Sequence, residues 1–366
     1  MAPTPGEPAS AAPAPAEPAS AAPASAIVQG VPAGSSKVFN PDTSIIGNFI
    51  AAGGKNPNGD APSLSLAEAE IAFQAVVDPY ARADFYLGAS SEGLSIEEGF
   101  ITFTTLPANL LLKVGKVKAQ FGKANTLHSH QLPYIDTPLV LQNLVGGEEG
   151  LSDSGFSLSH LIQNPFLYLD VTGEVFAANS DVFQSPERSK LNYVGHVRAY
   201  RDLTEATNLD FGASFAFGPT DVNPADFGDP GSDRVLNKKM YAVDATFRYR
   251  PLRRAIYHRL NLRTELIWSR QDLPLGQQAD AFGVYGLGEY QMNRRWYIGA
   301  RFDRSGRALE PDLVDTGGSV FLTYWPSEFS QIRGQFRRTN YGDGIRANEF
   351  FLQFNFAIGA HGAHPF

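Results

Sequence analysis

The stretch LDFGASFAF, residues 209–217, places apolar side chains at every second position, with small or polar residues between most of them. Successive side chains of a β-strand point to opposite faces, so this alternation predicts a strand with one apolar and one polar face. The same period recurs in YAVDATFRY (241–249), LNLRTELIW (260–268) and WYIGARFD (296–303). Such segments extend from about residue 44 to residue 358, and their number is about sixteen.

Soluble β-proteins also show alternating apolar and polar residues, so alternation alone does not identify a membrane barrel. The residue types on the polar faces distinguish the two classes. These faces repeatedly hold arginine together with carboxylates, as in Arg82 with Asp84 and Arg301 with Asp303, and this suits a water-filled lumen. Aromatic residues stand at the ends of the apolar faces, like the interfacial girdles of outer-membrane barrels. We therefore predict an all-β fold, a transmembrane antiparallel β-barrel of about 16 strands in the lipid of a bacterial outer membrane. A soluble all-β protein is the alternative.

Composition narrows the possible functions. The 366 residues include no cysteine, which excludes disulfides, thiolate metal sites and a cysteine nucleophile. The formal net charge of −8 argues against a nucleic-acid partner. There is no long apolar run that would predict a transmembrane helix, and a barrel needs none because each strand exposes only alternate side chains to lipid.

Residues 1–38 differ from the rest of the chain. They are rich in Ala, Pro and Ser, and the unit EPASAAPA occurs twice, starting at Glu7 and at Glu17. This composition predicts a disordered segment that precedes a barrel domain at 39–366. The segment lacks the basic start and continuous apolar core of a secretory signal. We expect the export signal to have been removed or to lie outside this sequence.

The connections alternate in length. Short turns are expected at 78–79, 106–109, 163–165, 292–295 and 326–329, and we assign them to the periplasmic side. Longer stretches at 179–190, 218–237, 270–280 and 305–315 are assigned to the outside because they are rich in Gly, Pro and Asp. A wider turn at 251–258 is an exception. The connection at 123–153 is too apolar for a solvated loop, so we expect it to fold into the barrel and narrow it.

Near this connection the chain resembles a known family. VGKVKAQFGKAN, residues 114–125, is similar to the corresponding segment of phosphate-selective porins of the O and P type. The following residues also resemble porin-like proteins described as zinc-regulated or TonB-dependent outer-membrane receptors. The resemblance implies a sixteen-stranded, trimeric channel. A TonB-dependent receptor proper would need about 22 strands around a plug domain, and this chain has neither the length nor a folded plug.

Charged residues that could line such a pore fall into two groups. Basic candidates precede the connection or lie on polar strand faces, and acidic candidates lie in the connection itself. Together they predict a field across the constriction that passes small polar solutes and ions. Solvated lumen residues or internal ion pairs are the simpler interpretation. The basic candidates are Lys113, Lys116, Lys118, Lys123, Arg198, Arg248, Arg263, Arg301, Arg333 and Arg337, and the acidic ones are Asp136, Glu148, Glu149 and Asp153.

His128 and His130 form a His-x-His pair in the same connection, with Asp136 nearby in sequence. Imidazole and carboxylate groups suit zinc, so the pair is a candidate metal site, with loop packing as the alternative. No spacing of Ser, His and Asp is diagnostic of a catalytic array, so we expect no enzyme activity. No cofactor is expected.

These patterns favour a passive diffusion porin in a Gram-negative outer membrane, and the resemblance to the porin family implies that it acts as a homotrimer. The alternatives are a substrate-specific channel for an oxyanion such as phosphate or for a metal-linked solute, and a structural barrel with a closed lumen.

Overall fold

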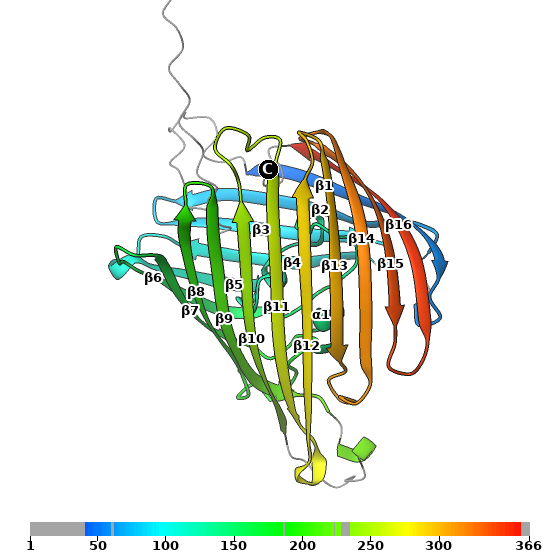
Figure 1. The fold of residues 1–366 in the computed structure, drawn as a ribbon. Coiled ribbons are helices and arrows are strands. Elements are labelled where there is room, and N and C mark those ends of the chain that lie inside the picture. The colour runs from blue at the N-terminus through cyan, green and yellow to red at the C-terminus, as the bar shows by residue number, and fades with distance from the viewer. Residues whose placement is uncertain are drawn as a thin grey trace, which may run out of the picture.

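The computed structural model describes residues 41–359 apart from 60–61, 92, 186, 223 and 228–234. The expected disordered segment at 1–38 and its boundary with the barrel at residue 39 lie outside the described residues. Within the described part the chain is almost entirely β-structure, and its strands form one ring (Figure 1). The predicted fold, an antiparallel barrel of 16 strands, is confirmed.

Each strand pairs antiparallel with its neighbours in sequence, and β1 pairs with β16 to close the ring. The strands are β1 Asp42–Lys55, β2 Leu64–Asp78, β3 Ala81–Ser90, β4 Gly93–Phe103, β5 Leu110–Lys118, β6 Ser152–Ile162, β7 Tyr168–Phe176, β8 Asn192–Thr204, β9 Thr207–Thr220, β10 Leu236–Tyr249, β11 Arg259–Asp272, β12 Gln278–Gln291, β13 Trp296–Gly306, β14 Val314–Ser327, β15 Ser330–Asn340 and β16 Arg346–Gly359.

Helical structure is confined to the connections. One α-helix, α1 (Leu139–Leu144), and the 3-10 helices η2 (Ala124–Thr126) and η3 (Ser129–Gln131) lie between β5 and β6. The other 3-10 helices in the described residues are η1 Pro107–Asn109, η4 Pro224–Phe227 and η5 Pro274–Gly276. No helix in the described ranges is long and apolar enough to cross a membrane.

The two faces of each strand differ as the alternation predicts. On β11, Leu262 and Trp268 are 44% and 41% exposed, whereas Glu265 on the opposite face is fully buried. On β10, Tyr241 and Tyr249 share the outer face and are 49% and 40% exposed. A closed ring has one inside and one outside, so the exposed apolar face is the exterior that meets lipid.

Some connections differ from their predicted lengths. The stretch 270–280 shortens to 273–277 because β11 and β12 stay paired as far as Asp272 and Gln278. The stretch 305–315 shortens to 307–313 for the same reason. The wider turn at 251–258 is held by its own hydrogen bonds, and the Gln291 amide of β12 donates to the carbonyl of Ile256 at 3.0 Å.

The exterior assignment predicts the effect of a charge in the middle of β10. Val243 shares its face with Tyr241, so Val243→Arg should lower the free energy of unfolding by about 2–4 kcal/mol in phospholipid bilayers, as arginine does at the midplane of a barrel exterior. Urea titration followed by tryptophan fluorescence measures the change. Val243→Leu is the matched control. Equal stability of the two variants would contradict an exterior position for residue 243.

Candidate functional site

The long connection between β5 and β6 lies against the inner face of the barrel. It comprises residues 119–151, so it begins four residues before and ends two residues before the predicted bounds of 123–153. Asp153 therefore belongs to β6 and not to the connection. Helix α1 packs mainly on β12 and β13. The strand residues that bind the connection, such as Glu265 and Arg301, lie on the faces opposite the exposed apolar side chains.

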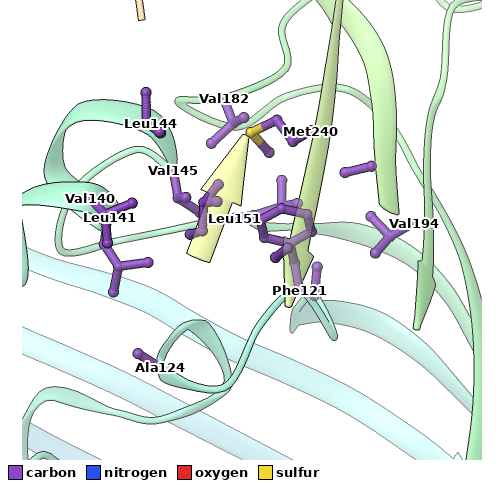
Figure 2. Close-up of a cluster of buried hydrophobic side chains, with 14 of the residues drawn as sticks. Phe121, Ala124, Val140, Leu141, Leu144, Val145, Leu151, Val182, Val194 and Met240 are labelled. Atoms are coloured by element: carbon purple, nitrogen blue, oxygen red, sulfur yellow. The ribbon is translucent and has the colours of Figure 1, made fainter. Parts of the chain in front are cut away.

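An apolar cluster fixes the connection inside the ring. Phe121, Val140, Leu144 and Leu151 of the connection are at most 1% exposed, and they belong to one cluster with Met240 of β10 (Figure 2). Burial of this kind stabilises the folded position because apolar surface is removed from water. It also explains why the segment is more apolar than a solvated loop.

Asp136 joins the connection to β13 and β15. Its carboxylate accepts from Arg301 at 2.6 Å and from Arg337 at 2.8 Å, and the side chain of Gln335 also donates to it. The Asp136 side chain is 8% exposed. Burial alone would raise the pKa of Asp136, but the two guanidinium groups outweigh it and hold the pKa below its usual value.

Neighbouring inner-face side chains satisfy the backbone of the connection. Arg333 donates to the carbonyls of Leu132 at 2.9 Å and Tyr134 at 3.3 Å. On β11, the Glu265 carboxylate accepts from the N–H groups of Lys123 at 2.9 Å and Ala124 at 2.5 Å. A non-strand backbone inside a barrel needs such partners, because an unpaired buried polar group is costly.

A basic group lies on the wall formed by β8, β9 and β10. Asp210 accepts from Arg198 at 2.6 Å, with Arg248 at 3.5 Å and the Lys123 ammonium at 3.8 Å. Three cations thus surround one carboxylate. Burial, with the nearby charge of Arg198, lowers the pKa of Lys123 to about 8 despite Asp210.

A second group, which we call the His128 cluster, comprises His128 and His130 with Glu68 and Glu70 of β2 and Glu97 and Glu98 of β4. His128 lies 3.0 Å from a carboxylate oxygen of each of Glu70, Glu97 and Glu98. Burial favours neutral imidazole, but these carboxylates overcome it and hold the pKa of His128 well above its usual value. The expected partner of the pair, Asp136, contacts the arginines of β13 and β15 instead.

The structure places most of the predicted pore residues on the inner face or in the connection. Lys116 is an exception that corrects the prediction, while Lys118, at the end of β5, donates from its ammonium group to the carbonyl of Glu149 in the connection at 3.4 Å. Lys116 shares the outer face of β5 with Val114, and it donates to the carbonyl of Ile96, whose side chain is 52% exposed. Inner-face residues are Lys113, Asp153, Arg198, Arg248, Arg263, Arg301, Arg333 and Arg337, and connection residues are Lys123, Asp136, Glu148 and Glu149.

The sequence reasoning missed the acidic half of the site. Glu68, Glu70, Glu97, Glu98, Asp210 and Glu265 were not among the candidates. Two signals were available. Glu68 and Glu70 have the period of one strand face, and the adjacent pair Glu97–Glu98 interrupts the alternation of β4.

Comparisons with known proteins agree with this architecture. No family model matches the chain. A protein of Aquifex aeolicus (strain VF5) with an uncharacterised function is 28% identical over 91% of this chain and 81% of its own. An anion-selective porin from Comamonas acidovorans has a TM-score of 0.62 at 10% identity, over 86% of this chain and 98% of its own.

Two further solved structures share the fold. Salmonella typhi OmpF, in complex with daunomycin, has a TM-score of 0.58 at 9% identity over 87% of this chain and 97% of its own. The trimer form of OmpT, an outer membrane protein of Vibrio cholerae, has a TM-score of 0.56 at 10% identity over 87% and 100%. With its closed ring and apolar exterior, the chain is built for a bacterial outer membrane, which confirms the expected location.

The contacts of Asp136 predict a stability change. Asp136→Asn removes one of the two carboxylates that each of Arg301 and Arg337 contacts. Asp303 and Glu349 remain as partners, so the free energy of unfolding should fall by about 2 kcal/mol. Urea titration in detergent measures it. Asp312→Asn, at an exposed acid, is the control and should change stability by less than about 0.5 kcal/mol. Indistinguishable variants would contradict the role given to Asp136.

The depressed pKa of Asp136 also sets the direction of a pH effect. A carboxyl group whose pKa is lower when folded contributes stability above its unfolded pKa and loses it as the pH falls through the folded value. The stability difference between the wild type and Asp136→Asn should therefore shrink on acidification below about pH 4. A constant difference over that range, in the same urea titrations, would be inconsistent with an ionised Asp136.

Proposed function

We propose that this protein is an outer-membrane channel through which small polar solutes and ions diffuse passively, and that residues 119–151 narrow its lumen. The observation that carries this proposal is the attachment of the connection to several inner-face side chains, including Glu265, Arg301 and Arg333. An apolar cluster and buried ion pairs hold it in one position, so it can act as a fixed constriction.

The charges beside the connection support polar solutes rather than apolar ones. A cavity of about 390 Å³ is lined by Asp136, Glu148, Arg337 and Glu349 among others. Both signs of charge face this space, and mixed charge across a constriction favours hydrated ions and zwitterions over apolar solutes. Many inner-face groups near the connection are buried, which favours a narrow passage.

Single-channel recording tests the proposal. Protein reconstituted in a planar bilayer should give discrete current steps, and Asp136→Asn should make the open current noisier or larger because the constriction loses an anchor. Asp312→Asn is again the control. If a correctly folded barrel gave no channel current, the diffusion-channel function would be excluded, and a structural barrel with a closed lumen would be the better account.

A selective channel for an oxyanion is a second candidate, and the basic group around Asp210 favours it. Arg198, Arg248 and Lys123 together carry more positive charge than Asp210 neutralises. Guanidinium and ammonium groups bind phosphate-like anions well. Phosphate should reduce the chloride current of the wild type, and it should reduce the current of Arg198→Gln less. A chloride current that is the same with and without phosphate would exclude this candidate.

Lys123 gives the channel a pH dependence. Its pKa of about 8 means that it is cationic at about pH 7 and loses its charge above about pH 9. The preference for anions, read as the reversal potential in a salt gradient, should therefore fall over this range. Lys123→Gln should show little change, while Lys239→Gln, at an exposed lysine, should behave like the wild type. A wild-type potential that stays constant would show that Lys123 does not act on permeating ions.

The assembly is a further part of the proposal. The trimer form of the similar Vibrio cholerae protein supports a homotrimer here, which light scattering in detergent would test.

We propose no catalytic role. The hydroxyl of Ser159 pairs with Thr172 at 2.7 Å. Ser214 lies 2.8 Å from His196 Nδ1 and also accepts from the Gly122 N–H at 2.9 Å, but among the described residues no carboxylate hydrogen-bonds to His196 to complete a catalytic array. An assay with chromogenic esters and peptides would detect a hydrolase.

A further inference from the structure

A β-bulge in β4 directs two consecutive carboxylates to one point. Tyr86 of β3 pairs with Glu98, but the next residue, Leu87, pairs with Ile96, so Glu97 is an extra residue in the strand. In a regular strand Glu97 and Glu98 would face opposite sides. The bulge turns both toward the lumen, where each lies 3.0 Å from a different nitrogen of His128.

A second bulge, in β2, supplies the facing carboxylates. Asn48 of β1 pairs with Glu68, and Phe49 pairs with Leu66, so Ala67 is extra. Glu68 accepts from the hydroxyl of Ser129 at 2.6 Å, and Glu70 reaches both histidines. The connection and two irregular strands therefore meet at His128 and His130, which are 6% and 2% exposed.

The contacts of Glu70 are unusual for a simple ion pair. Its Oε2 atom lies 3.0 Å from His128 Nδ1 and 3.3 Å from His130 Nδ1, yet it accepts no well-aligned hydrogen bond, and Glu70 is 2% exposed. His128 Nδ1 is equally close to Glu97 Oε2, at 3.0 Å. A single ring N–H cannot point along both contacts, so two carboxylates converge on one nitrogen.

We propose that Glu70, Glu97 and His128 form a binding site for one divalent transition-metal ion of the zinc class. Their ligand atoms lie within 4.8 Å of one another, and all three residues are buried. Zinc takes nitrogen and carboxylate ligands at about 2.0–2.2 Å in a tetrahedral arrangement, which separates ligand atoms by about 3.3 Å. The separations of His128 Nδ1 from Glu70 Oε2 and from Glu97 Oε2, both 3.0 Å, are close to this value.

The chemistry of the site favours zinc over harder cations. Imidazole nitrogen suits Zn²⁺, whereas Ca²⁺ and Mg²⁺ prefer all-oxygen sites. The two carboxylates neutralise the charge of a divalent ion, and His130 Nδ1, near Glu70, is in reach as a fourth ligand. Because His128 belongs to the connection and the carboxylates to β2 and β4, a bound ion would fasten the connection to this wall.

Zinc titration of the full chain tests the site. The protein is purified without an affinity tag and is freed of metal with EDTA. It carries His361→Ala and His364→Ala to remove the second closely spaced pair of histidines. Isothermal titration with ZnCl₂ should show one equivalent bound. His128→Gln and Glu70→Gln should each weaken binding at least tenfold, and His258→Gln, far from the cluster in the turn after β10, should not.

Spectroscopy keeps the test decisive if a variant fails to fold. X-ray absorption at the zinc edge of the unsubstituted cluster should show a shell of nitrogen and oxygen with an imidazole contribution. The proposal is overturned if the protein binds no zinc, or if binding is unchanged in His128→Gln, and the cluster is then an ion-pair network alone. Zinc binding without channel current would leave this inference intact, and current without zinc binding would remove this inference only.

Discussion

The pairing of β1 with β16 is the constraint on which the rest of the structure depends. Backbone N–H and C=O groups find no water in a bilayer, so a sheet can cross it only if the sheet has no open edge. The pairing runs from Ser44 opposite Gly359 to Lys55 opposite Asn348, and it removes both edges at once. Closure also divides the side chains into an exterior and an interior, which is why alternation has a consistent meaning along the whole chain.

The closed interior creates the conditions in which the long connection can be buried. It is narrow enough for residues 119–151 to touch β11, β13 and β15, and polar enough to satisfy their backbone. Apolar packing around Phe121 and Val140 supplies the driving force, and the arginines supply specificity of position. Each contribution would be weak alone, since apolar side chains could slide and ion pairs in open water contribute little.

Charge is distributed unevenly around this interior. The β8 to β10 wall carries an excess of cations around Asp210, and the β2 to β4 wall carries four carboxylates around two histidines. A solute in the lumen would meet opposite potentials on different walls, which is the physical basis of the proposed preference for polar solutes. The anchor at Asp136 takes part in neither group because Arg301 and Arg337 already neutralise it.

The sequence by itself determined the strand count, the inner and outer faces, and which connection was too apolar to stay in solvent. These follow from local periodicity and composition, as residues 209–217 and 260–268 show. Only the tertiary structure decided that His128 meets Glu70 and Glu97 rather than Asp136. The physical reason is that the partners in the site, 30 to 201 residues apart in sequence, are set by ring closure, strand register and bulges, which single-strand patterns do not encode.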